Sequence, residues 1–226
     1  MFKEFIINKL PFLFVIHNLY FKSKIFISRD SYADSKEDLF ILKNIKKRGF
    51  YIDVGCHHPT RLNNCHLLYK KGWRGINIDI NKSTIDLFNF ARPKDININA
   101  AVSLKEQEVN FFYDKPLSLY NSLKKQKNLK FKKTIKSYKL DSLIKKTKYK
   151  DQPIDFLSVD VEGKDLEVLK SLNFNTYKPR YICVEIWGKE KNKKFKLKND
   201  KIFKFLRKKN YSIVFNKKEN YIFKRI

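Results

Sequence analysis

Short apolar runs alternate with segments of helical spacing along most of the chain. Runs rich in Ile, Val, Leu and Phe are typical of buried parallel strands, and they lie at 50–54, 75–79, 95–102, 154–160 and 180–186. Apolar residues recur at helical spacing at 35–45, 65–71, 82–91 and 164–172, and Ser35 is the expected N-cap of the first of these helices. The alternation predicts an α/β fold in which helices cover both faces of a parallel sheet.

Two regions depart from this alternation. A helix at 200–209 followed by strands at 211–215 and 220–223 predicts that the sheet has an antiparallel edge. Residues 109–113 predict an added strand. The lysine-rich stretch 115–133 lacks a clear period, so we expect a mobile loop over the ligand site.

Residues 1–30 are expected to form an extension ahead of one domain at 31–226. Residues 1–26 are apolar and aromatic but carry several charges, and the longest apolar run, at 12–16, is far shorter than the ~20 residues of a membrane span. We therefore expect an amphipathic helix that packs on the domain or makes peripheral contact with a membrane, and no transmembrane span.

The composition is strongly basic. The 226 residues include 50 Lys and Arg against 23 Asp and Glu, a net charge of +27. Such a charge would attract nucleic acid, an anionic membrane or an acidic substrate. Lysine supplies most of it and is spread along the whole chain, whereas phosphate-binding sites rely more on arginine. This distribution favours a compositional origin over a dedicated polyanion site.

The three cysteines, Cys56, Cys65 and Cys183, have no disulfide-like spacing. An odd number without such a pattern indicates a reducing compartment, so we expect a cytoplasmic protein.

Acidic residues follow most of the predicted strands. In open α/β sheets, ligands bind at the carboxyl ends of the strands. A dinucleotide site needs the pattern G-x-G-x-x-G, but Gly55 is followed by His57 and His58 with no later glycine. Carboxylates would repel phosphate and suit a ligand with an ammonium group, a positive sulfur and a ribose diol. The acids are Asp53, Asp79, Asp160, Glu162 and Glu185.

Asp79 follows Asp53 by 26 positions (79 − 53), near the roughly 20-residue offset at which an acid binds a ribose diol in such folds. An N-cap role for Asp79 at the helix that begins near Lys82 is the alternative. Asp53 has the parallel alternative of capping the end of its strand.

These residues, together with several further motifs, resemble the FkbM-type methyltransferases. The resemblance covers roughly residues 30–187 and is specific because the pieces occur in order. The pieces are Asp53-Val-Gly-Cys-His-His-Pro59, Leu68-Tyr-Lys-Lys-Gly-Trp-Arg-Gly-Ile-Asn-Ile-Asp79, Asn99-Ala-Ala-Val-Ser103, Leu140-Asp-Ser-Leu143 and Asp155-Phe-Leu-Ser-Val-Asp-Val-Glu-Gly163.

The resemblance implies a Rossmann-like class I methyltransferase fold, with a mostly parallel seven-stranded sheet, that transfers a methyl group from S-adenosylmethionine, usually to oxygen. It implies that Asp53 and Gly55 form the first cofactor loop and that Asp79 binds the ribose. It also implies that Ala100 and Ala101 lie near the adenine, and Asp160 near the methionine end.

A hydroxyl acceptor must lose a proton, which calls for a general base or a metal. Glu162 is the first candidate base, ahead of Asp160 and His57, with His58 and Glu185 also in view. Its alternative role is that of an acid favoured near a helix N-terminus.

We predict no metal site. The cluster of Cys56, His57, His58, Cys65 and His66 lacks the paired spacing of zinc ligands, and a divalent ion on Asp160 and Glu162 is not favoured.

The expected acceptor is a hydroxyl of a glycan or small molecule. Two alternatives stay open. The basic charge would suit an RNA methyltransferase, for which the sequence shows no recognisable RNA-binding module. A non-catalytic binding module on the same fold is the other.

Overall fold

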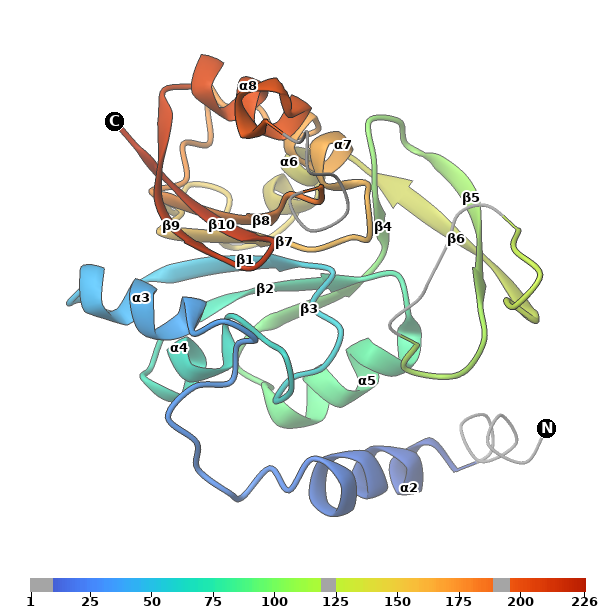
Figure 1. Ribbon diagram of the computed structural model, residues 1–226. Helices are drawn as coiled ribbons and strands as arrows, with labels where there is room; N and C mark the ends of the chain where they lie inside the picture. Colours follow the sequence, from blue (N-terminus) through green and yellow to red (C-terminus); the bar gives the residue numbers. More distant parts are fainter. Residues whose placement is uncertain (1–9, 119–124, 189–195) are drawn as a thin grey trace.

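The computed structural model describes residues 10–118, 125–188 and 196–226. A seven-stranded sheet forms its centre (Figure 1), and the strands follow the order β3-β2-β1-β7-β8-β10-β9. Their bounds are β1 Phe50–Val54, β2 Arg74–Asp79, β3 Ile96–Asn99, β7 Phe156–Val159, β8 Tyr181–Glu185, β9 Tyr211–Lys217 and β10 Asn220–Arg225.

The neighbouring pairs from β3 to β8 are all parallel, whereas β10 is antiparallel to both β8 and β9. The mostly parallel seven-stranded sheet with its antiparallel hairpin at one edge is therefore confirmed. All five residues of β1 are buried, because helices cover both faces of the sheet and leave no position for a polar alternation.

Helices pack on both faces (Figure 1), as expected. On one face of the sheet, the helix residues Leu140, Val168 and Leu206 belong to the larger apolar cluster. On the other face, Ile41 and Leu68 belong to a second cluster. The helices are α3 Glu37–Asn44, α4 His66–Lys70 and α5 Lys82–Ala91 on one face, and α6 Leu140–Lys145, α7 Asp165–Lys170 and α8 Lys201–Lys208 on the other; a short 3₁₀ turn, η2 Leu197–Asn199, precedes α8.

The first helix begins later than expected. Lys36, in the left-handed region with a φ of 71°, occupies the N-cap position, so the prediction that Ser35 is the cap was wrong. Instead, the Ser35 backbone N–H donates to Glu37 Oε2 at 2.8 Å. This bond holds the chain that leads into the helix, whose N-terminus has no side-chain cap.

A second sheet of three strands lies beside the carboxyl ends of the main sheet, with β6 Phe131–Tyr138 between β4 Ala101–Val102 and β5 Gln107–Tyr113. The strand predicted at 95–102 is thus two strands. The break falls at Ala100, whose N–H donates to the Asp79 carbonyl at 3.1 Å, after which Ala101 and Val102 pair with β6.

Strand β6 was not predicted, and residues 131–133 of the expected loop belong to it. Most positions of β6 are solvent-exposed or only partly buried, so it carries lysines rather than an apolar run. Residues 125–130 of that stretch are irregular; residues 119–124 lie outside the described part. The added strand expected at 109–113 is confirmed within β5.

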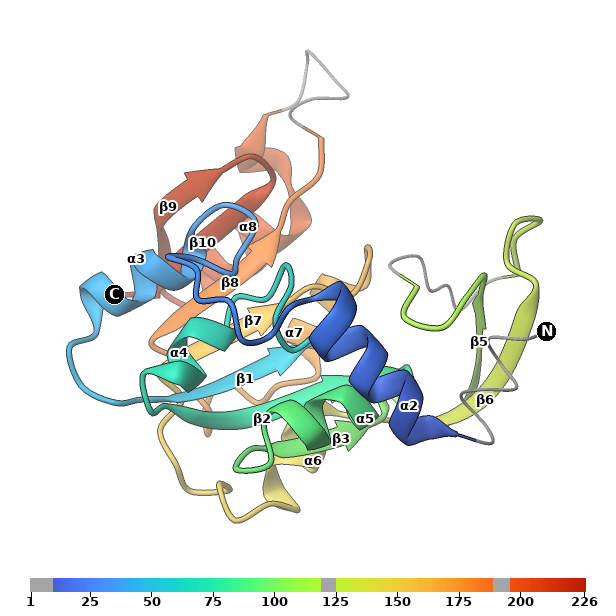
Figure 2. The ribbon, with the colours of Figure 1, turned by 90° about the horizontal axis from the view of Figure 1, so that it is seen from below.

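The N-terminal extension contains the expected helix, formed by α2 Pro11–Ile16 and a π-helical continuation, η1 His17–Lys22. Figure 2 shows that it runs across α5, where Val15 and Leu19 pack against Leu87. No described helix has the length and apolarity to cross a membrane. A boundary between extension and domain at residue 30 stays a prediction.

A buried arginine fixes the loop that follows β1. Arg92, immediately after α5, is fully buried and donates to the Pro59 carbonyl and to Asn63 Oδ1, the latter at 2.6 Å. Asn63 in turn donates to Asp53 Oδ2 at 2.9 Å and to the Cys56 carbonyl at 3.1 Å. The network joins β1, the loop and α5 through buried polar groups that are costly to leave unpaired.

We expect Arg92→Met to lower the free energy of unfolding by about 3–5 kcal/mol, because it leaves buried acceptors and the neighbouring Asp53 without a cation. Chemical denaturation measures this loss. Arg207→Met is the matched control, since Arg207 is exposed, and should change stability by less than about 1 kcal/mol. Similar effects of the two substitutions would contradict the role given to Arg92.

Candidate active site

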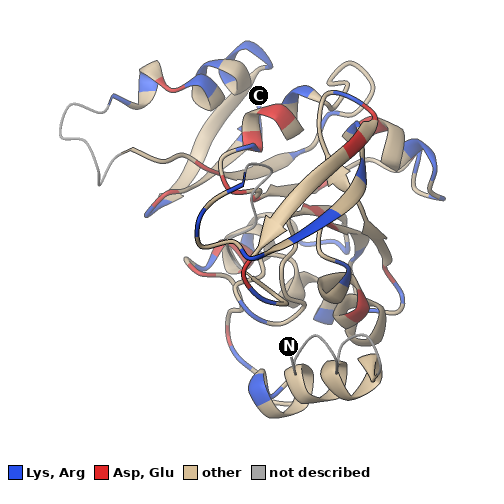
Figure 3. Cartoon of the chain, turned by 90° about the vertical axis from the view of Figure 1, so that its right-hand side faces the viewer, with Lys and Arg blue, Asp and Glu red and all other residues tan. Residues whose placement is uncertain are grey.

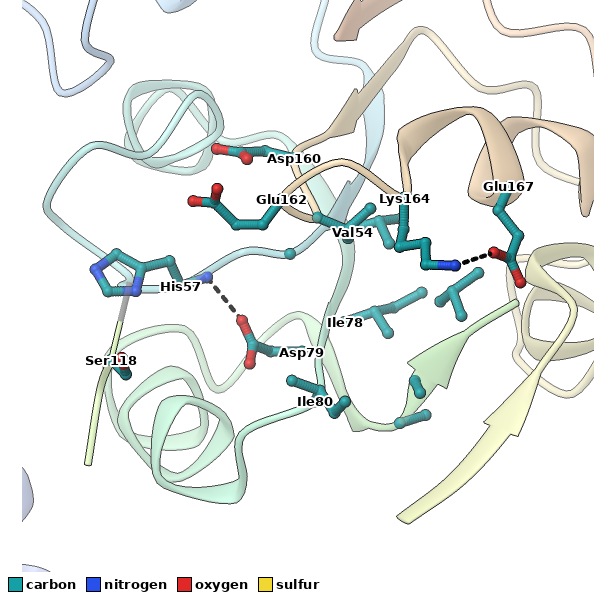
Figure 4. Close-up of a pocket in the computed structure, with 15 residues that line it drawn as sticks. Val54, His57, Ile78, Asp79, Ile80, Ser118, Asp160, Glu162, Lys164 and Glu167 are labelled. Carbon is teal, nitrogen blue, oxygen red and sulfur yellow. Dashed lines mark hydrogen bonds and ion pairs between the residues drawn. The ribbon is translucent and has the colours of Figure 1, made fainter. Parts of the chain in front are cut away.

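A pocket opens at the carboxyl ends of β1, β2 and β7, the position expected for a ligand in an open α/β sheet. Figure 4 shows residues that line it. They are Val54, Gly55, His57, Ile78, Asp79, Ile80, Ala100, Ala101, Val102, Ser118, Asp160, Val161, Glu162, Lys164 and Glu167. Of the predicted site residues, all but Asp53, His58 and Glu185 are among them.

Gly55 brings the ends of β1 and β7 together. Its φ is +78°, and a Cβ built on it would lie 1.8 Å from the Asp160 carbonyl oxygen. Any side chain would therefore collide with backbone as well as strain the left-handed conformation. This close approach places the loop of Gly55 and the turn of Asp160 on one pocket wall.

Asp79 is buried at the end of β2. Its Oδ2 accepts from the His57 backbone N–H at 3.0 Å and its Oδ1 accepts from the Asn81 N–H at 2.7 Å. Burial raises the pKa of Asp79 to about 6. The alternative that Asp79 is the N-cap of α5 was wrong, because Asn81 occupies that position and accepts from the Ser83 N–H at 3.0 Å.

Asp53 lies behind the pocket wall. It is buried, it accepts from the Asn63 side chain, and burial raises its pKa. A direct cofactor contact for Asp53 stays a prediction. Its observed contact holds the loop that carries His57.

Two acidic side chains of the turn after β7 face the pocket. Figure 4 shows the Asp160 and Glu162 carboxyl groups turned to the same side of the pocket as the His57 ring. The Asp160 side chain is in contact with solvent inside the pocket. Its pKa is raised well above the usual range, first by burial within the pocket and then by repulsion from neighbouring acids, of which Glu185 is the strongest.

Glu162 has a φ of +52°, a conformation held by the turn around it. Asp165 accepts from the Val161 and Gly163 N–H groups, both at 3.2 Å. Restricted hydration and repulsion from Asp165 raise the pKa of Glu162. Glu185 does not line the pocket; burial and repulsion from Glu162 raise its pKa to about 7.

The two histidines after Gly55 have different environments. His57 lines the pocket, and burial together with Arg61 lowers its pKa to about 4. His58 is buried away from the pocket, with Nε2 at 3.0 Å from Ser23 Oγ, and burial lowers its pKa to about 3. His58 therefore joins the loop to the N-terminal extension.

The sequence analysis did not predict several apolar residues of the pocket or its lysine. Ile78 precedes Asp79 on a strand already predicted, so its place beside the ligand follows from that assignment. Lys164, paired with Glu167 at 3.1 Å, and Ser118 carried no local signal. Among the described residues, no three His, Cys, Asp or Glu side chains form a group that could hold a metal ion.

The parallel sheet with a pocket at its carboxyl edge has the Rossmann-like arrangement expected of a class I methyltransferase. The sequence profile of the methyltransferase FkbM domain matches residues 53–213. The chain therefore belongs to the FkbM methyltransferase family. No curated protein sequence matches the chain.

A solved structure is also similar in fold, that of a TehB-like S-adenosylmethionine-dependent methyltransferase from Corynebacterium glutamicum. The two share 10% sequence identity and a TM-score of 0.46, over 96% of this chain and all of the other.

The raised pKa of Asp79 predicts a pH-dependent stability. The ordinary pKa is 3.8 and the folded value is about 6, so the folded protein binds this proton more tightly. The resulting stabilisation is complete below about pH 4 and is lost as the pH rises through about 6. Asp79→Asn removes this titration. The stability of the wild type relative to Asp79→Asn should therefore fall by roughly 3 kcal/mol from pH 4 to 7. Urea titrations at several pH values measure it, and a constant difference would refute it.

Proposed function

We propose that the protein transfers a methyl group from S-adenosylmethionine to a hydroxyl group of a glycan or small-molecule acceptor. The observation that carries this proposal is the group of three carboxyl side chains, Asp79, Asp160 and Glu162, that line one pocket at the sheet's carboxyl edge.

The pocket fits a cationic methyl donor. The pKa of each of these carboxyl groups is raised, first by burial and then by repulsion from neighbouring acids. The pocket lysine, Lys164, is already paired with Glu167. An ammonium group and a sulfonium would relieve the repulsion, whereas a pyrophosphate would increase it.

Each cofactor contact is assigned by chemistry. Asp79 would accept hydrogen bonds from the ribose hydroxyls, since each of its oxygens has accepted one N–H and retains a further lone pair. Asp160 would bind the ammonium, and Gly55 lets the backbone approach. Ala100 and Ala101 leave room for the adenine. When bound, S-adenosylmethionine supplies an electrophilic methyl group on a positive sulfur.

Glu162 is the proposed general base. A base works best when its pKa approaches the working pH, and the pKa of Glu162 is raised. His57, with a pKa of about 4, is neutral at pH 7 but a weak proton acceptor. Holding the acceptor hydroxyl in line with the methyl group can supply about 7–11 kcal/mol of the barrier.

We place the protein in the cytoplasm. All three cysteines are free and buried, an arrangement that needs no oxidising compartment.

Glu162→Gln should lower kcat by about 10²–10⁴-fold, because the amide keeps the shape but cannot take the proton. S-adenosylmethionine affinity should fall far less than kcat, since Asp79 and Asp160 keep their carboxyl groups. In the wild type, activity should be lost as the pH falls through the raised pKa of Glu162, above the ordinary 4.5. The control is Glu108→Gln, at an exposed position of β5. An unchanged kcat would remove Glu162 as the base.

Asp79→Ala should weaken S-adenosylmethionine binding by about 1–3 kcal/mol, through loss of hydrogen bonds to the ribose. Calorimetry measures it, with Asp86→Ala as control because Asp86 pairs with Lys82 on the surface of α5. No binding heat from the wild type would favour a non-catalytic module.

Acceptor class is tested by incubation with methyl-labelled donor and either hydroxyl-bearing glycans or total RNA. Label in RNA, with binding that falls steeply with salt, would overturn the proposed acceptor.

A further inference from the structure

The N-terminal segment 10–29 presents an unusual concentration of exposed apolar side chains, which we call the N-terminal face. Thirteen large hydrophobic residues of the described chain are exposed, and seven of them fall in this segment. The most exposed of these seven are Phe21 at 71% and Phe26 at 70%. The others are Leu10, Phe12, Leu13, Tyr20 and Ile27.

The inner side of the same segment is firmly attached to the domain. Val15 and Leu19 are buried against Leu87 of α5, and Ser23 Oγ donates to the Asn18 carbonyl at 2.7 Å while contacting His58 Nε2. The segment is therefore packed on the domain by its inner side, and its outer side is exposed to solvent.

The face extends onto α5. The Phe12 and Tyr20 rings each lie 6.3 Å from the Phe90 ring, edge to face, and Phe90 is itself 41% exposed. Three elements of the chain, α2, η1 and α5, therefore contribute to one aromatic surface. Aromatic side chains of this kind are favoured at the boundary between water and lipid.

The charge of the face has one sign. No acidic residue occurs from 10 to 29, and Lys22, Lys24 and Arg29 are exposed. Figure 3 shows the N-terminal helix without red along its length and with blue at one end. Basic residues beside exposed aromatic ones are the pattern by which interfacial helices bind anionic lipid surfaces.

We propose that the N-terminal face binds the surface of an anionic lipid bilayer, with Phe21 and Phe26 inserted at the boundary and Lys22 and Lys24 against the headgroups. No described helix can cross a membrane, so the binding is peripheral. A bilayer suits the face better than a protein partner, because the charged side chains of residues 10–29 are all basic, whereas a protein interface has a mixed polar rim.

The face is also joined to the edges of the pocket. His58, which contacts Ser23, follows pocket-lining His57. Leu117 packs against the cluster of Val15 and Leu19 and precedes Ser118, which lines the pocket. Bilayer binding therefore holds the enzyme by the segment that packs on both of these neighbours of the pocket.

Co-sedimentation with phosphatidylcholine vesicles, with and without phosphatidylserine, tests the apolar part. Phe21→Ser with Phe26→Ser should weaken binding to the anionic vesicles by about tenfold or more, from the apolar area no longer inserted. The matched control is Leu104→Ser with Val214→Ser, since both residues are exposed elsewhere; it should bind as the wild type does. An unchanged far-ultraviolet circular dichroism spectrum and cooperative thermal unfolding confirm that each variant is folded.

A second pair separates local binding from attraction by the whole basic protein. Lys22→Glu with Lys24→Glu should weaken binding several-fold more than Lys198→Glu with Lys204→Glu, which makes the same change of net charge on the opposite side of the sheet, at η2 and α8. Equal effects of the two Lys pairs would overturn the proposal, and so would vesicle binding that the Phe substitutions leave unchanged. A dimer that the Phe substitutions dissociate, detected by sedimentation velocity, would also overturn it. The vesicle assay uses no methyl donor, so its failure is distinct from failure of the proposed chemistry.

Discussion

The site depends on the close approach between the loop after β1 and the turn after β7. Gly55 permits it, because the Asp160 carbonyl occupies the space that a Cβ would need. The parallel pairing of β1 with β2 and β7 brings Asp79 to the same edge. Three segments far apart in the sequence thus meet around one pocket, and the buried Arg92 network holds the loop between them in place.

The same geometry brings acids together at an energetic cost. Raised pKa values at Asp79, Asp160 and Glu162 show that the protein without ligand holds these groups in an environment that disfavours their charge. The cationic donor proposed above would offset that cost, and the pocket would then favour it over an anionic ligand. The turn of Glu162, the proposed base, is kept in shape by Asp165.

Much of the fold was predictable because four central strands, β1, β2, β7 and β8, are short and largely buried. Helix α5 was predicted with its observed bounds, since its apolar residues repeat with a clear period. Strand β6 escaped prediction because its exposed positions carry lysine, and β4 because it continues an apolar run begun by β3. Ser35 is not the cap because the helix begins at Glu37, which puts Lys36 in the N-cap position.

The sequence alone determined the α/β order of the elements and the acids that follow the strands, because hydrophobic period and residue chemistry are local properties. Only the tertiary structure decided which acids reach the pocket. Asp79 and Asp160 line it, whereas Asp53 lies behind Asn63, since side-chain direction at a strand end depends on partners distant in the chain. It also decided that His58 joins Ser23, a contact that no spacing along the sequence could reveal.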